Sequence, residues 1–130
     1  MKAACLFAGQ GTQVLGMTRA LSETFPCASS FLERTDEILG FSLSRVMHQG
    51  PLQDLNSTEN SQPAIFANAA MILEVLEQEF GIPTGSFCSV AAGHSLGEYS
   101  ALYAAKAIDY ATALGIVVGI DQTLRFHVVF

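Results

Sequence analysis

The stretch that most constrains the fold is Gly93-His94-Ser95-Leu96-Gly97, which lies between a short apolar run and a helix-like run. It is a G-x-S-x-G pattern in a strand–turn–helix context. The chain has to reverse sharply at Ser95, and side chains two positions to either side would clash, so Gly93 and Gly97 are needed there. The pattern predicts an exposed Ser95 hydroxyl at the end of a strand. The N–H groups of the following helix would face an oxyanion formed at this serine.

The same pentapeptide has a purely structural interpretation. A tight turn from a strand into a helix, capped by a serine, gives the same pattern without any chemistry. The pentapeptide alone therefore supports two interpretations of Ser95 equally, a catalytic nucleophile and a structural turn residue.

Composition limits the remaining possibilities. The chain has 130 residues, half of them hydrophobic and 14% charged, which is typical of one small globular domain. The net charge of −6 argues against nucleic acid or an anionic membrane surface as a partner. The three cysteines, Cys5, Cys27 and Cys88, are far apart and form no C-x-x-C, so we expect buried thiols and no disulfide or zinc site.

No segment is typical of targeting or membrane insertion. The apolar run after Lys2 is too short for a signal peptide. The apolar stretch 101–120 contains Lys106 and Asp109, so it is not expected to span a bilayer.

Hydrophobic periodicity and helix punctuation predict a strand followed by helices, then a second strand and more helices. The expected strands are 3–7, buried on both faces, and 87–92; the expected helices are 15–20, 27–39, 41–47, 52–55, 63–80, 96–105 and 108–114. A lone His48 beside the Gly50-Pro51 turn is expected to be solvated.

Two further motifs are ambiguous taken alone. Gly9-Gln10-Gly11-Thr12-Gln13 fits an ordinary loop between a strand and a helix, although its glycines also allow close approach of a ligand. Its spacing does not fit G-x-G-x-x-G, so a dinucleotide site is not favoured. Taken alone, Gln62 before Pro63 fits a capping residue at the start of a helix, and this interpretation is compatible with a further role.

Taken together, three segments resemble the malonyl-CoA:acyl carrier protein transacylases, the malonyltransferases of fatty acid synthesis. These segments are 7–13, Gln62-Pro63 and 94–102. The resemblance runs from about Ala4 to Leu114, so residues 1–114 are interpreted as the N-terminal part of an acyltransferase catalytic domain. Residues 115–130 are interpreted as a divergent tail, arising from a truncated gene model, intron read-through or a frameshift. The implied fold is α/β: a partial α/β-hydrolase-like core with a short parallel sheet and covering helices, lacking the ferredoxin-like subdomain.

The resemblance also implies a reaction. Ser95 would take the malonyl group from coenzyme A as an ester and pass it to the phosphopantetheine thiol of acyl carrier protein. The N–H groups of Gln10 and Leu96 would form the oxyanion hole, and Gln62, Gly9, Gly11 and His94 would bind substrate. No metal or other cofactor is implied. The expected partners are malonyl-CoA and acyl carrier protein, and the chain is expected to be a monomer in the cytoplasm, a mitochondrion or a plastid.

Two features depart from this family. Its members have an arginine that pairs with the malonyl carboxylate, and Ile120 stands about where it belongs. The family's general-base histidine lies beyond residue 130. His94 is expected to point away from Ser95, and His127 lies in the tail without a match. We therefore expect the isolated chain to be weak or inactive.

Two rival functions remain open. The first is a serine esterase or lipase-like hydrolase that uses the same strand–turn–helix geometry. The second is a non-catalytic fragment that binds coenzyme A or a carrier protein.

Overall fold

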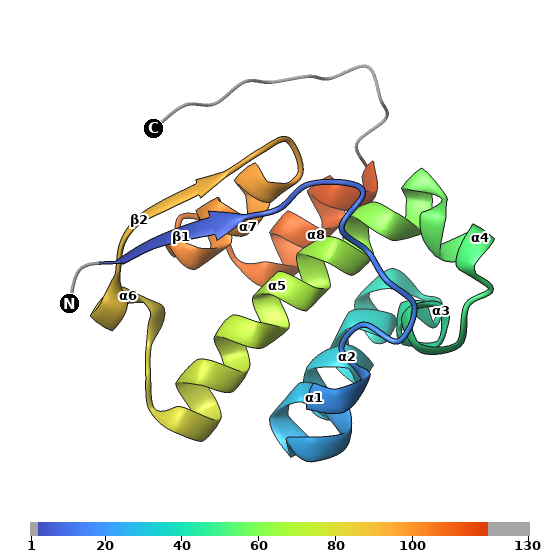
Figure 1. Ribbon diagram of the computed structural model, residues 1–130, viewed down its shortest axis with the longest axis horizontal. Helices are drawn as coiled ribbons and strands as arrows, with labels where there is room; N and C mark the ends of the chain where they lie inside the picture. The colour runs from blue at the N-terminus through green and yellow to red at the C-terminus, as the bar shows by residue number, and fades with distance from the viewer. Residues whose placement is uncertain (1–2, 120–130) are drawn as a thin grey trace.

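A computed structural model describes residues 3–119, and these form a two-stranded parallel sheet that packs with one face against a group of helices (Figure 1). In chain order the elements are β1 (Ala3–Phe7), α1 (Arg19–Thr24), α2 (Pro26–Leu39), α3 (Leu43–Gln49), α4 (Leu52–Asn56), α5 (Thr58–Phe80), α6 (Thr84–Phe87), β2 (Cys88–Gly93), α7 (Gly97–Ala104) and α8 (Tyr110–Gly119). The predicted α/β class, with a short parallel sheet and covering helices, is confirmed.

The sheet brings the two predicted loops together. β1 and β2 pair in parallel, with Leu6 opposite Ala92 and Phe7 opposite Gly93. Helix α7 packs against both strands. Because parallel strands end at the same edge, the loop after β1 and the turn after β2 start side by side.

Helix α5 runs through the middle of the molecule, with the sheet, α7 and α8 on one side and α1 to α4 on the other (Figure 1). Fully buried side chains on both sides of α5 include Phe66, Met71 and Leu114. The Tyr110 ring stacks on Phe66 at 5.5 Å, and its hydroxyl lies 2.7 Å from Thr35 Oγ1. Through these two contacts, α8 packs against both α5 and α2, and the three helices form one layer.

A smaller cluster fixes the long loop between β1 and α1. It contains the buried side chains of Met17, Leu43, Met47, Leu55 and Ala64. The Gly16 N–H donates to the Met47 carbonyl at 2.8 Å, which ties this loop to α3.

Four local predictions were wrong. The helix expected at 15–20 is displaced to Arg19–Thr24, because Gly16 and Thr18 have φ values of 86° and 68°, in the left-handed region, and residues 15–18 form turns. Strand 3–7 is not buried on both faces, because α7 covers only one face and leaves Leu6 80% exposed. Helix α5 begins at Thr58 rather than Pro63. The Ser57 carbonyl accepts the N–H groups of Asn60 and Ser61, so the first turn closes without the N–H that proline lacks. The second strand was expected to begin at Phe87, but Phe87 is the last residue of the short helix α6, and the strand begins at Cys88.

Between residues 3 and 119, no helix combines the length and the apolar character that a bilayer crossing requires.

Candidate active site

The turn at Ser95 has the geometry of a strained strand-to-helix reversal. Ser95 has a φ of 53°, in the left-handed region that residues other than glycine rarely adopt. The turn is closed by the Gly97 N–H, which donates to the His94 carbonyl at 2.9 Å, and by the Glu98 N–H, which donates to the Ser95 carbonyl at 3.0 Å. The Ser95 residue is exposed. The backbone therefore presents this serine at the end of β2, in front of α7.

Both glycines of the pattern are required by close packing. A Cβ on Gly93 would lie 1.9 Å from the Gly97 carbonyl oxygen. A Cβ on Gly97 would lie 2.2 Å from the Phe7 carbonyl oxygen. Both distances are impossible for real atoms, so the steric need expected from the sequence is present in the structure.

The loop after β1 lies against the same turn. The His94 N–H donates to the Phe7 carbonyl at 3.4 Å, and a Cβ on Gly9 would lie 2.8 Å from the His94 carbonyl oxygen. Gln10 follows directly and is exposed. Among residues 3–119, neither the Gln10 N–H nor the Leu96 N–H has a hydrogen-bond acceptor. Both donors are thus available, and their assignment to an oxyanion hole stays a prediction.

Gln13, which the sequence did not single out for a role, holds this loop in shape. Its Oε1 accepts the Gly11 N–H at 2.9 Å, and its Nε2 donates to Asn56 Oδ1 at 3.1 Å. The Thr12 hydroxyl adds a bond to the Gly9 carbonyl at 2.9 Å. The glycine loop is therefore anchored to the end of α4. The only signal in the sequence is that Gln13 closes the same motif as Gln10.

No base for Ser95 is found in the described part of the chain. The Ser95 hydroxyl has no hydrogen-bond partner within residues 3–119, and the His94 ring lies beside Gly9, with Nδ1 3.6 Å from the site of a Cβ there. The expectations for Ile120 and His127 fall outside the described residues.

His48 is not free in solvent, so that prediction was wrong. Its Nε2 lies 2.9 Å from Thr18 Oγ1, and its carbonyl accepts a bond from the Arg19 guanidinium. Burial, followed by the charge of Arg19, lowers the pKa of His48 below its usual value. This histidine thus serves to hold the loop before α1.

Gln62 occupies the fifth position of α5 and is half-buried. It cannot cap a helix that starts at Thr58, so the capping interpretation is wrong. Its side chain makes no hydrogen bond to Ser95 or Gln10 within the described residues. The role of Gln62 in substrate binding stays a prediction, as do those of Gly9, Gly11 and His94.

The Cys5 thiol is the other nucleophilic group near this edge of the sheet. Burial, followed by a hydrogen bond with Cys88 and the charge of that neighbour, raises the pKa of Cys5 to about 11. A thiol with this pKa is protonated at neutral pH and is a poor nucleophile.

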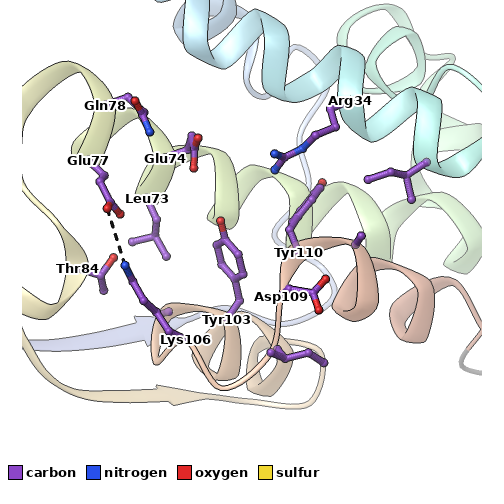
Figure 2. A pocket seen from close by; sticks show the side chains of 14 residues that line it. Arg34, Leu73, Glu74, Glu77, Gln78, Thr84, Tyr103, Lys106, Asp109 and Tyr110 are labelled. Carbon is purple, nitrogen blue, oxygen red and sulfur yellow. Dashed lines mark ion pairs between the residues drawn. The ribbon is translucent and has the colours of Figure 1, made fainter.

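A separate cavity of about 600 Å³ is lined by residues of α2, α5, α6, α7 and α8 and contains none of the predicted site residues (Figure 2). Lys106 on its wall pairs with Glu77 at 3.8 Å. The Arg34 guanidinium lies 5.3 Å from the centre of the Tyr110 ring. Burial raises the pKa of Tyr110 and of Tyr103, so both phenols stay protonated at neutral pH. Sequence reasoning missed this cavity because its walls come from five helices.

Within residues 3–119, no cluster of three or more His, Cys, Asp or Glu residues is arranged to hold a metal ion.

The parallel strand pair, the left-handed Ser95 and the close-packed glycines define an α/β protein with a strand–elbow–helix turn, a class in which the residue at the turn is exposed. Comparison with known proteins gives the particular family. The acyl transferase domain family matches residues 5–125, and the chain belongs to this family.

Individual members of the family are similar to this chain in both sequence and structure. The malonyl CoA-acyl carrier protein transacylase of Bacillus subtilis is 39% identical over 113 residues, which cover 87% of this chain and 34% of that protein. The crystal structure of an acyl-carrier-protein S-malonyltransferase from Bartonella henselae superposes with a TM-score of 0.86 at 37% identity, covering 91% of this chain and 37% of that one. A malonyl-transacylase in complex with its type II PKS acyl-carrier protein gives a TM-score of 0.80 at 40% identity, covering 91% of this chain and 37% of that one. The chain thus spans about a third of the length of the relatives it matches.

Proposed function

We propose that this chain carries the nucleophile-bearing part of a malonyl-CoA:acyl carrier protein transacylase. The observation that supports this most directly is the strained, exposed Ser95 in a turn that only glycines permit, in a member of the acyl transferase family. The relatives are malonyl-CoA:acyl carrier protein transacylases, and they suggest malonyl-CoA and acyl carrier protein as the substrates.

The proposed chemistry is a two-step acyl transfer. Ser95 Oγ attacks the thioester carbonyl of malonyl-CoA while its proton passes to a base outside the described residues. The carbon–sulfur bond then breaks, coenzyme A leaves as a thiol that has taken up a proton, and a malonyl ester remains on Ser95. The phosphopantetheine thiol of the carrier protein attacks this ester and takes the malonyl group, and Ser95 regains its proton.

Backbone donors would stabilise the charge in both steps. The N–H groups of Gln10 and Leu96 are unpaired among residues 3–119, and the loop that carries Gln10 is held against the turn by its contact with His94. Loss of one such donor raises the barrier by roughly 3 kcal/mol in enzymes of this kind. Gly9, Gly11, His94 and Gln62 are proposed to line the path of the substrate.

The proposed function is tested with a single-chain chimera. Residues 5–119 of this chain replace the matching segment of the Bacillus subtilis relative, and malonyl transfer to acyl carrier protein is measured beside hydrolysis of a simple ester. We expect transfer in the parent chimera, none in Ser95→Ala, and little ester hydrolysis in either. A folded chimera that hydrolyses esters without transferring malonyl would favour the esterase alternative. A folded chimera with neither activity would favour the non-catalytic alternative.

Finer assignments belong to the same proposal. We propose a monomer that acts without nucleic acid, in the cytoplasm, a mitochondrion or a plastid. We also propose that the acyltransferase part ends at Leu114, although α8 continues to Gly119 and the family match to residue 125. A transcript that encodes residues 115–130 in frame to a genuine stop would argue against an annotation error in this tail.

A further inference from the structure

We propose that Thr12 is a positioning residue for the acyl transfer, because its hydroxyl sets the direction of the Gln10 N–H. The inference rests on the proposed function, since that function makes the Gln10 N–H a donor to the oxyanion. Thr12 is assigned no contact with the substrate. It acts only through the backbone of the loop of residues 9–13.

The Gln10 N–H and the Gly9 carbonyl belong to the same peptide group. This group is planar and trans, so its N–H and its carbonyl point in opposite directions. The Thr12 hydroxyl donates to the Gly9 carbonyl oxygen at 2.9 Å. A hydrogen bond that holds the oxygen on one side of the group therefore also fixes where the N–H points on the other side.

Without this hydrogen bond the peptide group is free to turn over. Among residues 3–119, the Thr12 hydroxyl is the one donor to the Gly9 carbonyl, and the Gln10 N–H has no acceptor. Gly9 has no Cβ, so rotation of the chain on that side of the group is little restricted. A turned group would place a carbonyl oxygen where the N–H was. Its partial negative charge would oppose the oxyanion that the N–H is proposed to stabilise.

The backbone on either side of this peptide group is held by other contacts. Gly9 packs so closely against the turn that a Cβ on it would lie 2.8 Å from the His94 carbonyl oxygen. The Gln13 side chain accepts the Gly11 N–H at 2.9 Å, which fixes the next peptide group. Because these neighbours are fixed independently, loss of the Thr12 hydroxyl should change the direction of one N–H and leave the rest of the loop in place.

The exposure of Thr12 allows its hydroxyl to be tested without disturbing the core. Thr12 is exposed and belongs to neither cluster of buried side chains. Thr12→Val replaces the hydroxyl with a methyl group of similar size, and such a surface change should leave folding almost unaltered. Thr12→Ser keeps the hydroxyl, whereas Thr12→Ala removes it together with the methyl group.

The test uses the single-chain chimera described for the proposed function, with malonyl transfer measured at several concentrations of malonyl-CoA. We expect Thr12→Val and Thr12→Ala to lower kcat about tenfold with KM within about twofold of the parent, because the N–H acts on charge that develops in the transition state. Thr12→Ser should retain most of the parent kcat. Thr24→Val is the matched control: the exposed Thr24 hydroxyl also donates to a backbone carbonyl, that of Ala20 at 2.7 Å, but on α1.

A second measurement needs no substrate. The NMR order parameter of the Gln10 N–H reports how firmly this N–H is held, and it should be about 0.85 in the parent chimera and below about 0.6 in Thr12→Val. Thr12→Ser and Thr24→Val should keep the parent value. Circular dichroism of each variant checks that the helices remain formed, and Thr12→Ala serves in both measurements if Thr12→Val does not fold.

Several results would overturn the inference. In the kinetics, these are an unchanged kcat in the variants that lack the hydroxyl, a rise in KM alone, a Thr12→Ser variant as slow as Thr12→Val, or an equal loss in Thr24→Val. In the NMR measurement, it is an order parameter in Thr12→Val equal to that of the parent. A folded parent chimera that transfers no malonyl would refute the proposed function, and the order parameter would still decide whether Thr12 holds the Gln10 N–H.

Discussion

The helical layer and the sheet of this molecule are packed very differently. Helix α5 contacts α2 and α3 on one side and α7 and α8 on the other, and Phe66 on it is fully buried. The two strands are covered on one face only, and Leu6 on the other face is 80% exposed. Burial therefore stabilises mainly the helices, whereas the candidate nucleophile follows a strand of the less protected sheet.

The largest expected effect comes from the helical layer. Phe66→Ala should lower the free energy of unfolding by about 3–5 kcal/mol, because it leaves a cavity against the stacked Tyr110 ring. Leu6→Ala should change it by less than about 0.5 kcal/mol, because its side chain is largely in water. Urea denaturation of both variants measures the contrast. Equal losses would mean that the two regions are packed alike.

The next effect concerns the turn between the two regions. Gly97→Ala should destabilise the chain by roughly 1–3 kcal/mol, because the added Cβ would meet the Phe7 carbonyl oxygen at 2.2 Å. Gly115→Ala is the control: no atom lies within 4 Å of its Cβ, and alanine in α8 should stabilise the chain by about 0.5–1 kcal/mol. Thermal unfolding compares the two variants. A neutral Gly97→Ala would contradict the close approach of α7 to β1.

A smaller effect is expected in the loop of residues 9–13, which follows β1. Gln13→Ala removes the bonds to the Gly11 N–H and to Asn56, which should lower the free energy of unfolding by about 1 kcal/mol and leave the Gly11 N–H open to water. Amide hydrogen exchange at Gly11 should accelerate. Gln53→Ala, at an exposed glutamine of α4, should leave that exchange rate unchanged. Unchanged exchange at Gly11 in Gln13→Ala would show that the loop is ordered by other contacts.

The smallest expected effect is a pH dependence of the free energy of unfolding, caused by His48 in α3. The folded pKa of His48 is lowered, so the unfolded chain binds the proton more readily. The stability that His48 contributes is therefore present above pH 6.5 and is lost as the pH falls from there towards the lower folded pKa. Of the charges that act on this ring, Arg19 lowers the pKa, and Glu23 and Asp36 raise it.

His48→Gln should remove this part of the acid destabilisation, and Arg19→Gln should reduce it. Denaturation midpoints at pH 7.5 and 5.5 measure both changes. A His48→Gln variant that loses as much stability at pH 5.5 as the parent chain would contradict the assignment to His48.

Sequence reasoning succeeded where the information was local. Glycines two residues either side of Ser95, after an apolar run, located the turn, and the second strand was placed within one residue at each end. Gly40 correctly ended α2, where it has a φ of 75°. Such features depend on backbone sterics within a few residues, which the order of residue types reveals directly.

It failed where distant residues decide the structure. The exposure of Leu6 depends on what covers the sheet, which no local pattern in β1 records. The bond between Gln13 and Asn56 joins residues 43 positions apart. The cavity near Arg34 and Tyr110 is assembled from five helices. The role of Ser95 is a matter of reactivity, which neither the pattern nor the geometry measures.

The most direct test of the central assignment is the intact mass of the chimera after incubation with malonyl-CoA, with Ser95→Ala beside it. Our account predicts one malonyl adduct on the parent, located by peptide mapping to the segment that contains Ser95, and none on Ser95→Ala. The same adduct on Ser95→Ala would contradict the account, because another residue would then carry the acyl group.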